Sequence, residues 1–189
     1  MPRLFIAIDI EPSKALVDLL DGLRQNGRGL RVVQKQTLHL TLAFLGETDP
    51  RRIEPVASAM RDAVDGLVGF DLPLRGLDLF GTPEQPRVLL TRPAETSDAL
   101  PRLNELAERI RVALGDDLPA DRFGFTPHLT LARASDGPTA GRTLAPLLAK
   151  HGDTDFGTYR VDSVGLYGSE LSKAGPTYTQ LASAPLGSK

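Results

Sequence analysis

The chain has 189 residues, 41% of them hydrophobic, which suffices for one compact body and is too short for two large independent domains. It carries 22 Lys and Arg against 24 Asp and Glu, and this net charge of −2 excludes a protein that coats nucleic acid through a global positive field. The lack of cysteine excludes a disulfide scaffold, a thiolate zinc site and a cysteine nucleophile. We expect one domain spanning residues 1–189.

The first third of the chain predicts two strands, each followed by a helix. Residues 3–9 are mostly apolar and predict a buried strand, and Glu11-Pro12-Ser13 is typical of a helix start. That helix should end at Asn26-Gly27, and its inward stripe is Leu16, Leu19, Leu20 and Leu23. Residues 37–45 predict a second strand, closed by Gly46. A second helix should follow Asp49-Pro50, with Ile53, Val56, Ala57, Met60 and Val64 inward.

The rest of the chain alternates strands and helices at irregular spacing. Residues 70–80 and 87–91 predict two strands joined through Gly81-Thr82-Pro83. A long amphipathic helix follows, marked by Leu100, Leu103, Ala107, Ile110 and Leu114. Further along, we expect a strand at 124–132, a helix near 139–150, and closing strands around 158–167 and 176–182.

The N-terminal apolar run is too short for a signal peptide and meets Asp9 and Glu11 at once. No later stretch has the length of apolar sequence that a membrane span needs. We therefore expect a cytoplasmic protein without membrane contact.

A four-residue motif occurs twice, almost half a chain length apart. His39-Leu40-Thr41-Leu42 returns as His128-Leu129-Thr130-Leu131, each time in a predicted strand. One such segment is ordinary in a strand, but the two copies hold two of the three histidines in the chain. The repeat predicts an internally duplicated, two-lobed body to which each half contributes one copy.

Strand geometry places the histidine and the threonine of each copy on one face. Because side chains alternate along a strand, His39 and Thr41 point to one side while the two leucines point to the core, and the same holds for His128 and Thr130. If the two strands meet, two imidazoles and two hydroxyls line one cleft. One neutral histidine can then deprotonate water while a protonated one protects the leaving oxygen, and the threonines can donate to phosphate oxygens. This set suits attack on a phosphodiester.

Other chemistry is less well supported by the residues. His151 lies at the predicted end of a helix, where a cation is favourable, so we interpret it as structural. Neither motif has an adjacent carboxylate and there is no His-Glu-x-x-His, so we expect no metal and no other cofactor. The chain also lacks a phosphate-binding loop and a Lys-x-Asp-Gly segment, so the use of ATP is not supported.

At these residues the sequence closely resembles the two-histidine phosphoesterases, in particular the RNA 2′,3′-cyclic phosphodiesterases historically called 2′-5′ RNA ligases. The resemblance covers nearly the whole chain, and its segments are residues 3–8, 38–46, 127–133, 166–171 and 175–178. It implies an α+β, bilobal fold, in which pseudo-two-fold duplicated antiparallel sheets surround a central cleft and helices lie outside.

The resemblance also implies the activity and the roles of individual residues. The expected reaction is the opening of RNA 2′,3′-cyclic phosphates to 2′-phosphates, with His39 giving a proton to the 3′ oxygen and His128 taking one from water. The sequence alone does not decide which histidine has which role. Thr41, Thr130 and Arg133 should contact the phosphate, although strand parity turns Arg133 away from His128. The expected partners are RNA ends or nucleotides that carry the cyclic phosphate, bound by a monomer without an obligatory protein partner.

Several alternatives stay open at this point. The same residues suit another 2′-linked phosphodiester, or ATP-independent 2′-5′ joining of RNA ends, and a nucleotide or RNA-end binding module without turnover is the alternative from another class. Phe44 and Phe125 are candidates for base stacking, but their strand parity favours the core. Where relatives often have an aromatic residue before the first motif, this chain has Arg31-Val32-Val33.

Overall fold

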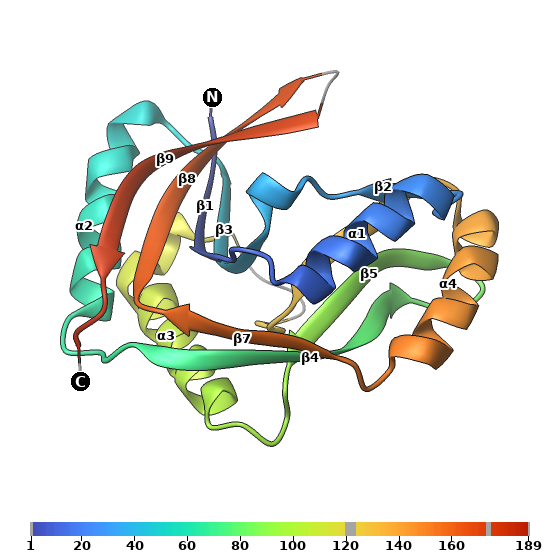
Figure 1. Cartoon of the computed structure of the whole chain (residues 1–189). Coiled ribbons are helices and arrows are strands. Elements are labelled where there is room, and N and C mark those ends of the chain that lie inside the picture. Colours follow the sequence, from blue (N-terminus) through green and yellow to red (C-terminus); the bar gives the residue numbers. More distant parts are fainter. Residues whose placement is uncertain (1, 120–123, 173–174, 189) are drawn as a thin grey trace.

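The computed structural model describes residues 2–119, 124–172 and 175–188, and Figure 1 shows curved antiparallel sheets with helices packed against them. The sheet that contains the first motif, here called the β3 sheet, has the strand order β3-β1-β8-β9. Its strands are β1 Arg3–Asp9, β3 His39–Glu47, β8 Ser163–Ser172 and β9 Gly175–Pro185. The sheet that contains the second motif, the β6 sheet, has the order β2-β6-β5-β4-β7. Its strands are β2 Leu30–Val32, β4 Phe70–Gly81, β5 Pro86–Pro93, β6 Leu129–Ala134 and β7 Asp155–Val161.

The helices agree with the apolar stripes of the sequence. They are α1 Lys14–Asn26, α2 Ile53–Val64, α3 Ala99–Leu114 and α4 Gly137–His151, with short 3-10 turns at Lys35–Thr37, Pro50–Arg52 and Gly115–Asp117. The Ser13 hydroxyl caps α1 by accepting the Leu16 amide at 3.2 Å. Most residues of the predicted stripes are buried, while Leu19, Ile53 and Leu100 are half-buried.

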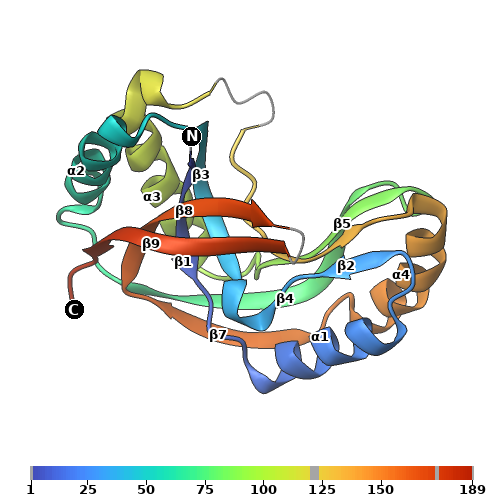
Figure 2. The ribbon, with the colours of Figure 1, turned by 90° about the horizontal axis from the view of Figure 1, so that it is seen from above.

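Two helices contact the sheet that does not precede them in the chain. Helix α1 follows β1 of the β3 sheet but contacts β2 and β7, whereas α3 follows β5 of the β6 sheet and contacts β3 as well as β4 and α2. Figure 2 shows the result, with α2 and α3 at one end of the molecule and α1 and α4 at the other. This exchange ties the two lobes together.

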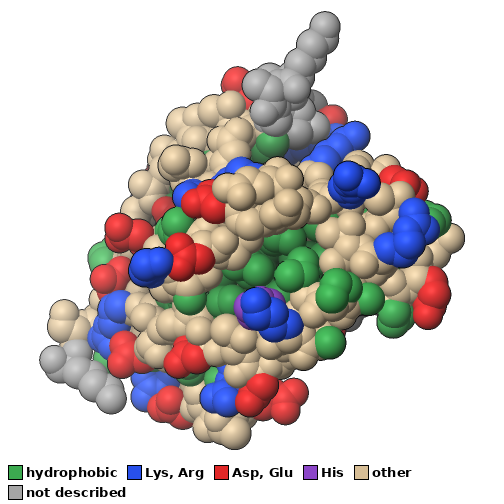
Figure 3. Space-filling view, turned by 45° about the vertical axis from the view of Figure 1, so that its right-hand side comes forward, with side chains coloured by type: hydrophobic (Ala, Val, Ile, Leu, Met, Phe, Trp, Pro, Cys, Tyr) green, Lys and Arg blue, Asp and Glu red, His purple; other side chains and the backbone are tan. Residues whose placement is uncertain are grey.

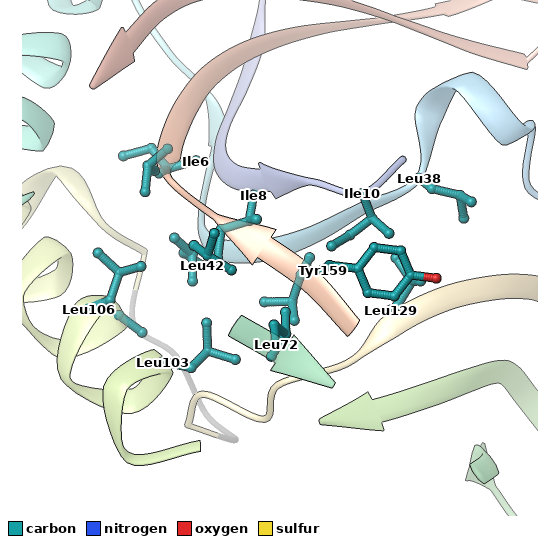
Figure 4. Packing of buried hydrophobic residues seen from close by; sticks show 14 of the residues in the cluster. Ile6, Ile8, Ile10, Leu38, Leu42, Leu72, Leu103, Leu106, Leu129 and Tyr159 are labelled. Atoms are coloured by element: carbon teal, nitrogen blue, oxygen red, sulfur yellow. The ribbon is translucent and has the colours of Figure 1, made fainter. Parts of the chain in front are cut away.

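A single hydrophobic cluster runs through both lobes. Figure 4 shows members of this cluster from β1, α3 and the β6 sheet, with Leu42 of β3 between Ile8 and Leu106 in this view. The strands β3 and β6, which carry the two motifs, are in contact with each other. The expected α+β, bilobal arrangement of antiparallel sheets with outer helices is therefore confirmed.

Two predicted strands differ from the structure, and one observed strand was not predicted. The strand expected at 124–132 begins only at Leu129, because Pro127 has no amide hydrogen for a ladder and Gly124 has a positive φ of 69°. The single strand expected at 158–167 is two strands in different sheets, β7 and β8, separated at Asp162. Strand β2 was not expected, since three residues are too few for an alternating pattern.

Within the described ranges, none of the helices combines the length and the apolar composition needed to cross a bilayer.

Candidate active site

His39 is held in one orientation at the start of β3. The 3-10 turn at Lys35–Thr37 brings the Thr37 carbonyl to 2.8 Å from Nδ1 of the ring. A carbonyl oxygen only accepts, so Nδ1 carries the hydrogen and donates it. The other ring nitrogen, Nε2, is left for chemistry.

His128 repeats this arrangement in the other lobe. Its Nδ1 donates to the Thr126 carbonyl at 2.7 Å, again two residues before the histidine. His128 therefore precedes β6 and is oriented by the chain that leads into the strand. The duplication thus includes the hydrogen bond that fixes the tautomer as well as the sequence motif.

A β-bulge follows the first motif and changes the direction of Phe44. Thr41 pairs with Ala7 and Ala43 pairs with Ile6, so Leu42 is an extra residue in β3 and both Leu42 and Ala43 are buried. Phe44 consequently returns to the face of His39 and Thr41, where 56% of its surface is exposed. The prediction that Phe44 lies in the core is wrong, because strand parity assumes an unbroken register. Phe125 is partly buried against the core, as predicted.

The same bulge follows the second motif and corrects the expected direction of Arg133. Thr130 pairs with Leu90 and Ala132 pairs with Leu89, so Leu131 is the extra residue in β6. Arg133 therefore emerges on the face of Thr130, not on the opposite one. Its charge lowers the pKa of both His39 and His128.

His39 lies among aromatic side chains and one carboxylate. Its ring centroid is 4.8 Å from that of Phe5 and 5.2 Å from that of Tyr178, and Asp9 is its cross-strand partner on β1. The Tyr167 hydroxyl donates a hydrogen bond to the Asp9 carboxylate. Burial lowers the pKa of His39, while the Thr37 carbonyl and the Asp9 carboxylate act in the opposite direction.

His128 lies beside a cation instead of a carboxylate. Its ring meets Phe80 edge to face at 4.8 Å, and the Arg92 guanidinium lies 5.3 Å from the Phe80 ring while donating to Asp78 at 2.6 Å. Burial lowers the pKa of His128, the Thr126 carbonyl raises it, and Arg92 and Arg133 lower it further. The two imidazoles are alike in their Nδ1 hydrogen bonds but differ in the charges that act on them, because only the pKa of His39 is raised by a carboxylate.

A cavity of about 900 Å³ extends from Thr41 on β3 to His128. Phe44 and Phe125 contribute to its walls, and α3 forms the opposite side. On the face drawn in Figure 3, a histidine side chain lies in a hollow among hydrophobic side chains, with a basic side chain next to it. The space is large enough for a nucleotide-sized ligand.

The structure therefore brings most of the predicted site residues to one face of each sheet. His39 and Thr41 lie on one lobe, His128, Thr130 and Arg133 on the other. His151 is separate, at the end of α4, where its Nδ1 is 3.1 Å from the Thr154 hydroxyl. No group of three or more His, Cys, Asp or Glu residues suited to a metal ion occurs in the described part of the chain.

The comparison with protein families decides the class of this site. Residues 6–90 and 95–178 match the family described as LigT like phosphoesterase. The chain belongs to this family. The resemblance stated from the two motifs is thereby confirmed, as is the expectation of an enzyme of the phosphoesterase class.

Individual members of the family are similar over almost the full chain. The RNA 2′,3′-cyclic phosphodiesterase of Aeropyrum pernix is 32% identical over 88% of this chain and 92% of its own length. The crystal structure of TT0787 of Thermus thermophilus superposes with a TM-score of 0.76 at 29% identity, covering 97% of each chain. E. coli LigT complexed with 3′-AMP has a TM-score of 0.74 at 25% identity, covering 98% of this chain and 99% of that chain.

Several side chains around the family motifs were missed from the sequence. Asp9 and Phe5 share one face of β1, a parity that residues 3–9 already contain, but nothing local says that this face meets His39. Tyr167 reaches Asp9 and Phe5, and Phe80 and Arg92 reach the surroundings of His128, only through strand pairing between distant segments. Their positions depend on tertiary structure.

Proposed function

We propose that this member of the family hydrolyses RNA 2′,3′-cyclic phosphate ends to 2′-phosphates without a metal ion, using His39 as the acid and His128 as the base. The observation that carries the proposal is the duplicated hydrogen bond from Nδ1 of each histidine to a carbonyl, at 2.8 and 2.7 Å, which presents both Nε2 atoms for proton transfer. The named relatives of this family support the choice of substrate.

In the proposed reaction, Nε2 of His128 takes a proton from water as the water oxygen attacks phosphorus. The bond between phosphorus and the 3′ oxygen breaks, and Nε2 of His39 gives that oxygen its proton, so the phosphate remains on the 2′ oxygen. The charges that differ between the two rings favour this direction, because Asp9 stabilises protonated His39 and Arg92 favours neutral His128, whereas Arg133 lowers the pKa of both. Each histidine ends in the protonation state in which the other began.

Three further side chains would hold the phosphate during the transfer. Thr41 and Thr130 can donate to non-bridging oxygens from opposite lobes, and Arg133, on the face of Thr130, can offer two parallel N–H donors. The same site would accept the 5′-hydroxyl of a second RNA in place of water. Such 2′-5′ joining needs no ATP, because the cyclic phosphate stores the required energy, but water is the more abundant nucleophile.

We further propose that the protein acts as a cytoplasmic monomer on RNA ends or nucleotides. The net charge of −2 supports contact limited to the cleft rather than coating of RNA. A single sharp species of monomer mass in solution is the expected result.

The deciding experiment measures turnover of an RNA oligonucleotide with a 2′,3′-cyclic phosphate end in the presence of a chelator, together with the isomer of the product. We expect a 2′-phosphate from the unaltered chain and a loss of about 10²- to 10⁴-fold in His39→Ala and in His128→Ala. His151→Ala is the matched control and should keep full activity. Binding without turnover would instead favour the binding module, and turnover that survives both substitutions would place the chemistry elsewhere.

A further inference from the structure

Arg31 and Arg133 are direct partners in the ladder between β2 and β6. Both side chains are exposed. Antiparallel partners have Cα atoms about 4.5 to 5.5 Å apart and point to the same face of the sheet. Two guanidinium groups thus leave one face of the β6 sheet side by side.

This face is the one that carries the second motif. The bulge at Leu131 puts Arg133 on the side of Thr130, and Arg31 shares that side through its pairing. Its neighbours Leu30 and Val32 pack against the hydrophobic core on the other side of the sheet. Since β2 is the edge strand, Arg31 extends the face of Thr130 and Arg133 outward.

Like charges placed directly opposite each other on a sheet are unfavourable unless an anion lies between them. Three other arginines of the same sheet have such a partner, in the pairs Arg75–Asp153, Arg92–Asp78 and Arg160–Asp71, and among the described residues Arg87 has none. Within the described residues, no carboxylate lies within ion-pair distance of Arg31 or Arg133. The pair is therefore suited to an anion that is not part of the chain.

We propose that Arg31 binds the phosphodiester on the 5′ side of the nucleoside that carries the cyclic phosphate, while Arg133 serves the reacting phosphate. This inference rests on the proposed function and specifies its substrate class as an oligonucleotide rather than a single nucleoside cyclic phosphate. Neighbouring guanidinium groups match successive phosphates of an extended strand, and a planar guanidinium can hold each phosphate through two hydrogen bonds.

The chain provides a control of the same charge away from the β6 sheet. Arg142 lies on helix α4 and is exposed, as Arg31 is. Arg142→Ala therefore makes the same change in charge as Arg31→Ala without changing the cleft face.

The test compares two ligand pairs that differ only in one phosphodiester. The substrates are a nucleoside 2′,3′-cyclic phosphate and the dinucleotide that extends it at the 5′ side, and the corresponding 2′-phosphates are used for equilibrium binding. Arg31→Ala should lower kcat/KM for the dinucleotide roughly 10-fold or more, mainly through KM, and weaken its 2′-phosphate to a similar degree, the effect of losing one hydrogen-bonded ion contact. It should leave both mononucleotides unchanged, whereas Arg133→Ala should impair all four ligands.

Equal effects of Arg31→Ala on dinucleotide and mononucleotide, or an effect no larger than that of Arg142→Ala, would overturn the assignment. The proposed function fails separately, if the unaltered chain opens neither cyclic phosphate. In that case, equilibrium binding of the two 2′-phosphates still decides whether Arg31 recognises the additional phosphodiester.

Discussion

Phe44 and Arg133 occupy equivalent positions in the two halves of the molecule. Each follows the sequence His-Leu-Thr-Leu-Ala, and each is turned to the side of its histidine by a bulge at the second leucine. The duplicated backbone thus presents an aromatic ring from the β3 sheet and a cation from the β6 sheet. An approximately symmetric pair of strands becomes an asymmetric site through this one difference in side chain.

The exposure of Phe44 makes a prediction about stability. Leu40→Ala, at a fully buried position on the same strand, should lower the free energy of unfolding by about 2 to 5 kcal/mol. Phe44→Ala should change it by about 0.5 kcal/mol or less, because most of the ring is already in water. Urea unfolding of both variants measures this difference. Equal losses would mean that β3 runs without the bulge and that Phe44 is in the core.

The Asp9 carboxylate should determine one limb of the pH profile. Asp9→Asn removes the negative charge that raises the pKa of His39, so that pKa falls further. Because His39 must be protonated to donate, activity is lost as pH rises through its pKa, and the alkaline limb of kcat/KM should move to lower pH. The acid limb, assigned to His128, should stay in place.

Tyr167→Phe serves as the control for this shift, because it removes the hydrogen bond to Asp9 but keeps the carboxylate. Its alkaline limb should not move to lower pH. If Asp9→Asn moved the acid limb instead, the roles of the two histidines would be exchanged.

The two motif threonines should contribute similarly and less than the histidines. Thr41→Val and Thr130→Val each remove a hydroxyl that would donate to a charged phosphate oxygen, which corresponds to a loss of roughly 10- to 150-fold in kcat/KM. Single-turnover rates at saturating substrate measure the effect on the chemical step. Full activity in either variant would remove that hydroxyl from the phosphate site.

The hydroxyl of Thr91, on the β6 sheet, is buried away from the phosphate site and should affect stability. It is fully buried on β5, opposite Leu129, and its Oγ1 has no hydrogen-bond partner among the described residues. Thr91→Val should raise the free energy of unfolding by about 1 to 3 kcal/mol, because an unsatisfied buried hydroxyl is replaced by a methyl group. Thermal or urea unfolding tests this, and a loss of stability would show that the hydroxyl is satisfied in solution.

Local patterns in the sequence determined the helices and the chemistry of the motifs. The apolar stripes of α1, α2 and α3 follow from the helical period, and His39 and Thr41 share a face because they are two residues apart in a strand. Both properties depend only on neighbours along the chain, so one sequence is sufficient to predict them. The recurrence of the motif also predicted two lobes.

Tertiary structure decided the properties that depend on pairing between distant segments. The bulges that turn Phe44 and Arg133 into the cleft are visible only in register against β1 and β5, since a bulge is defined by an extra residue relative to a partner strand. The pairing of β1 with β3 likewise puts Asp9 beside His39, and the pairing of β2 with β6 puts Arg31 beside Arg133. Which charge each imidazole meets is therefore fixed by strand register, a non-local property that side-chain alternation along one strand does not contain.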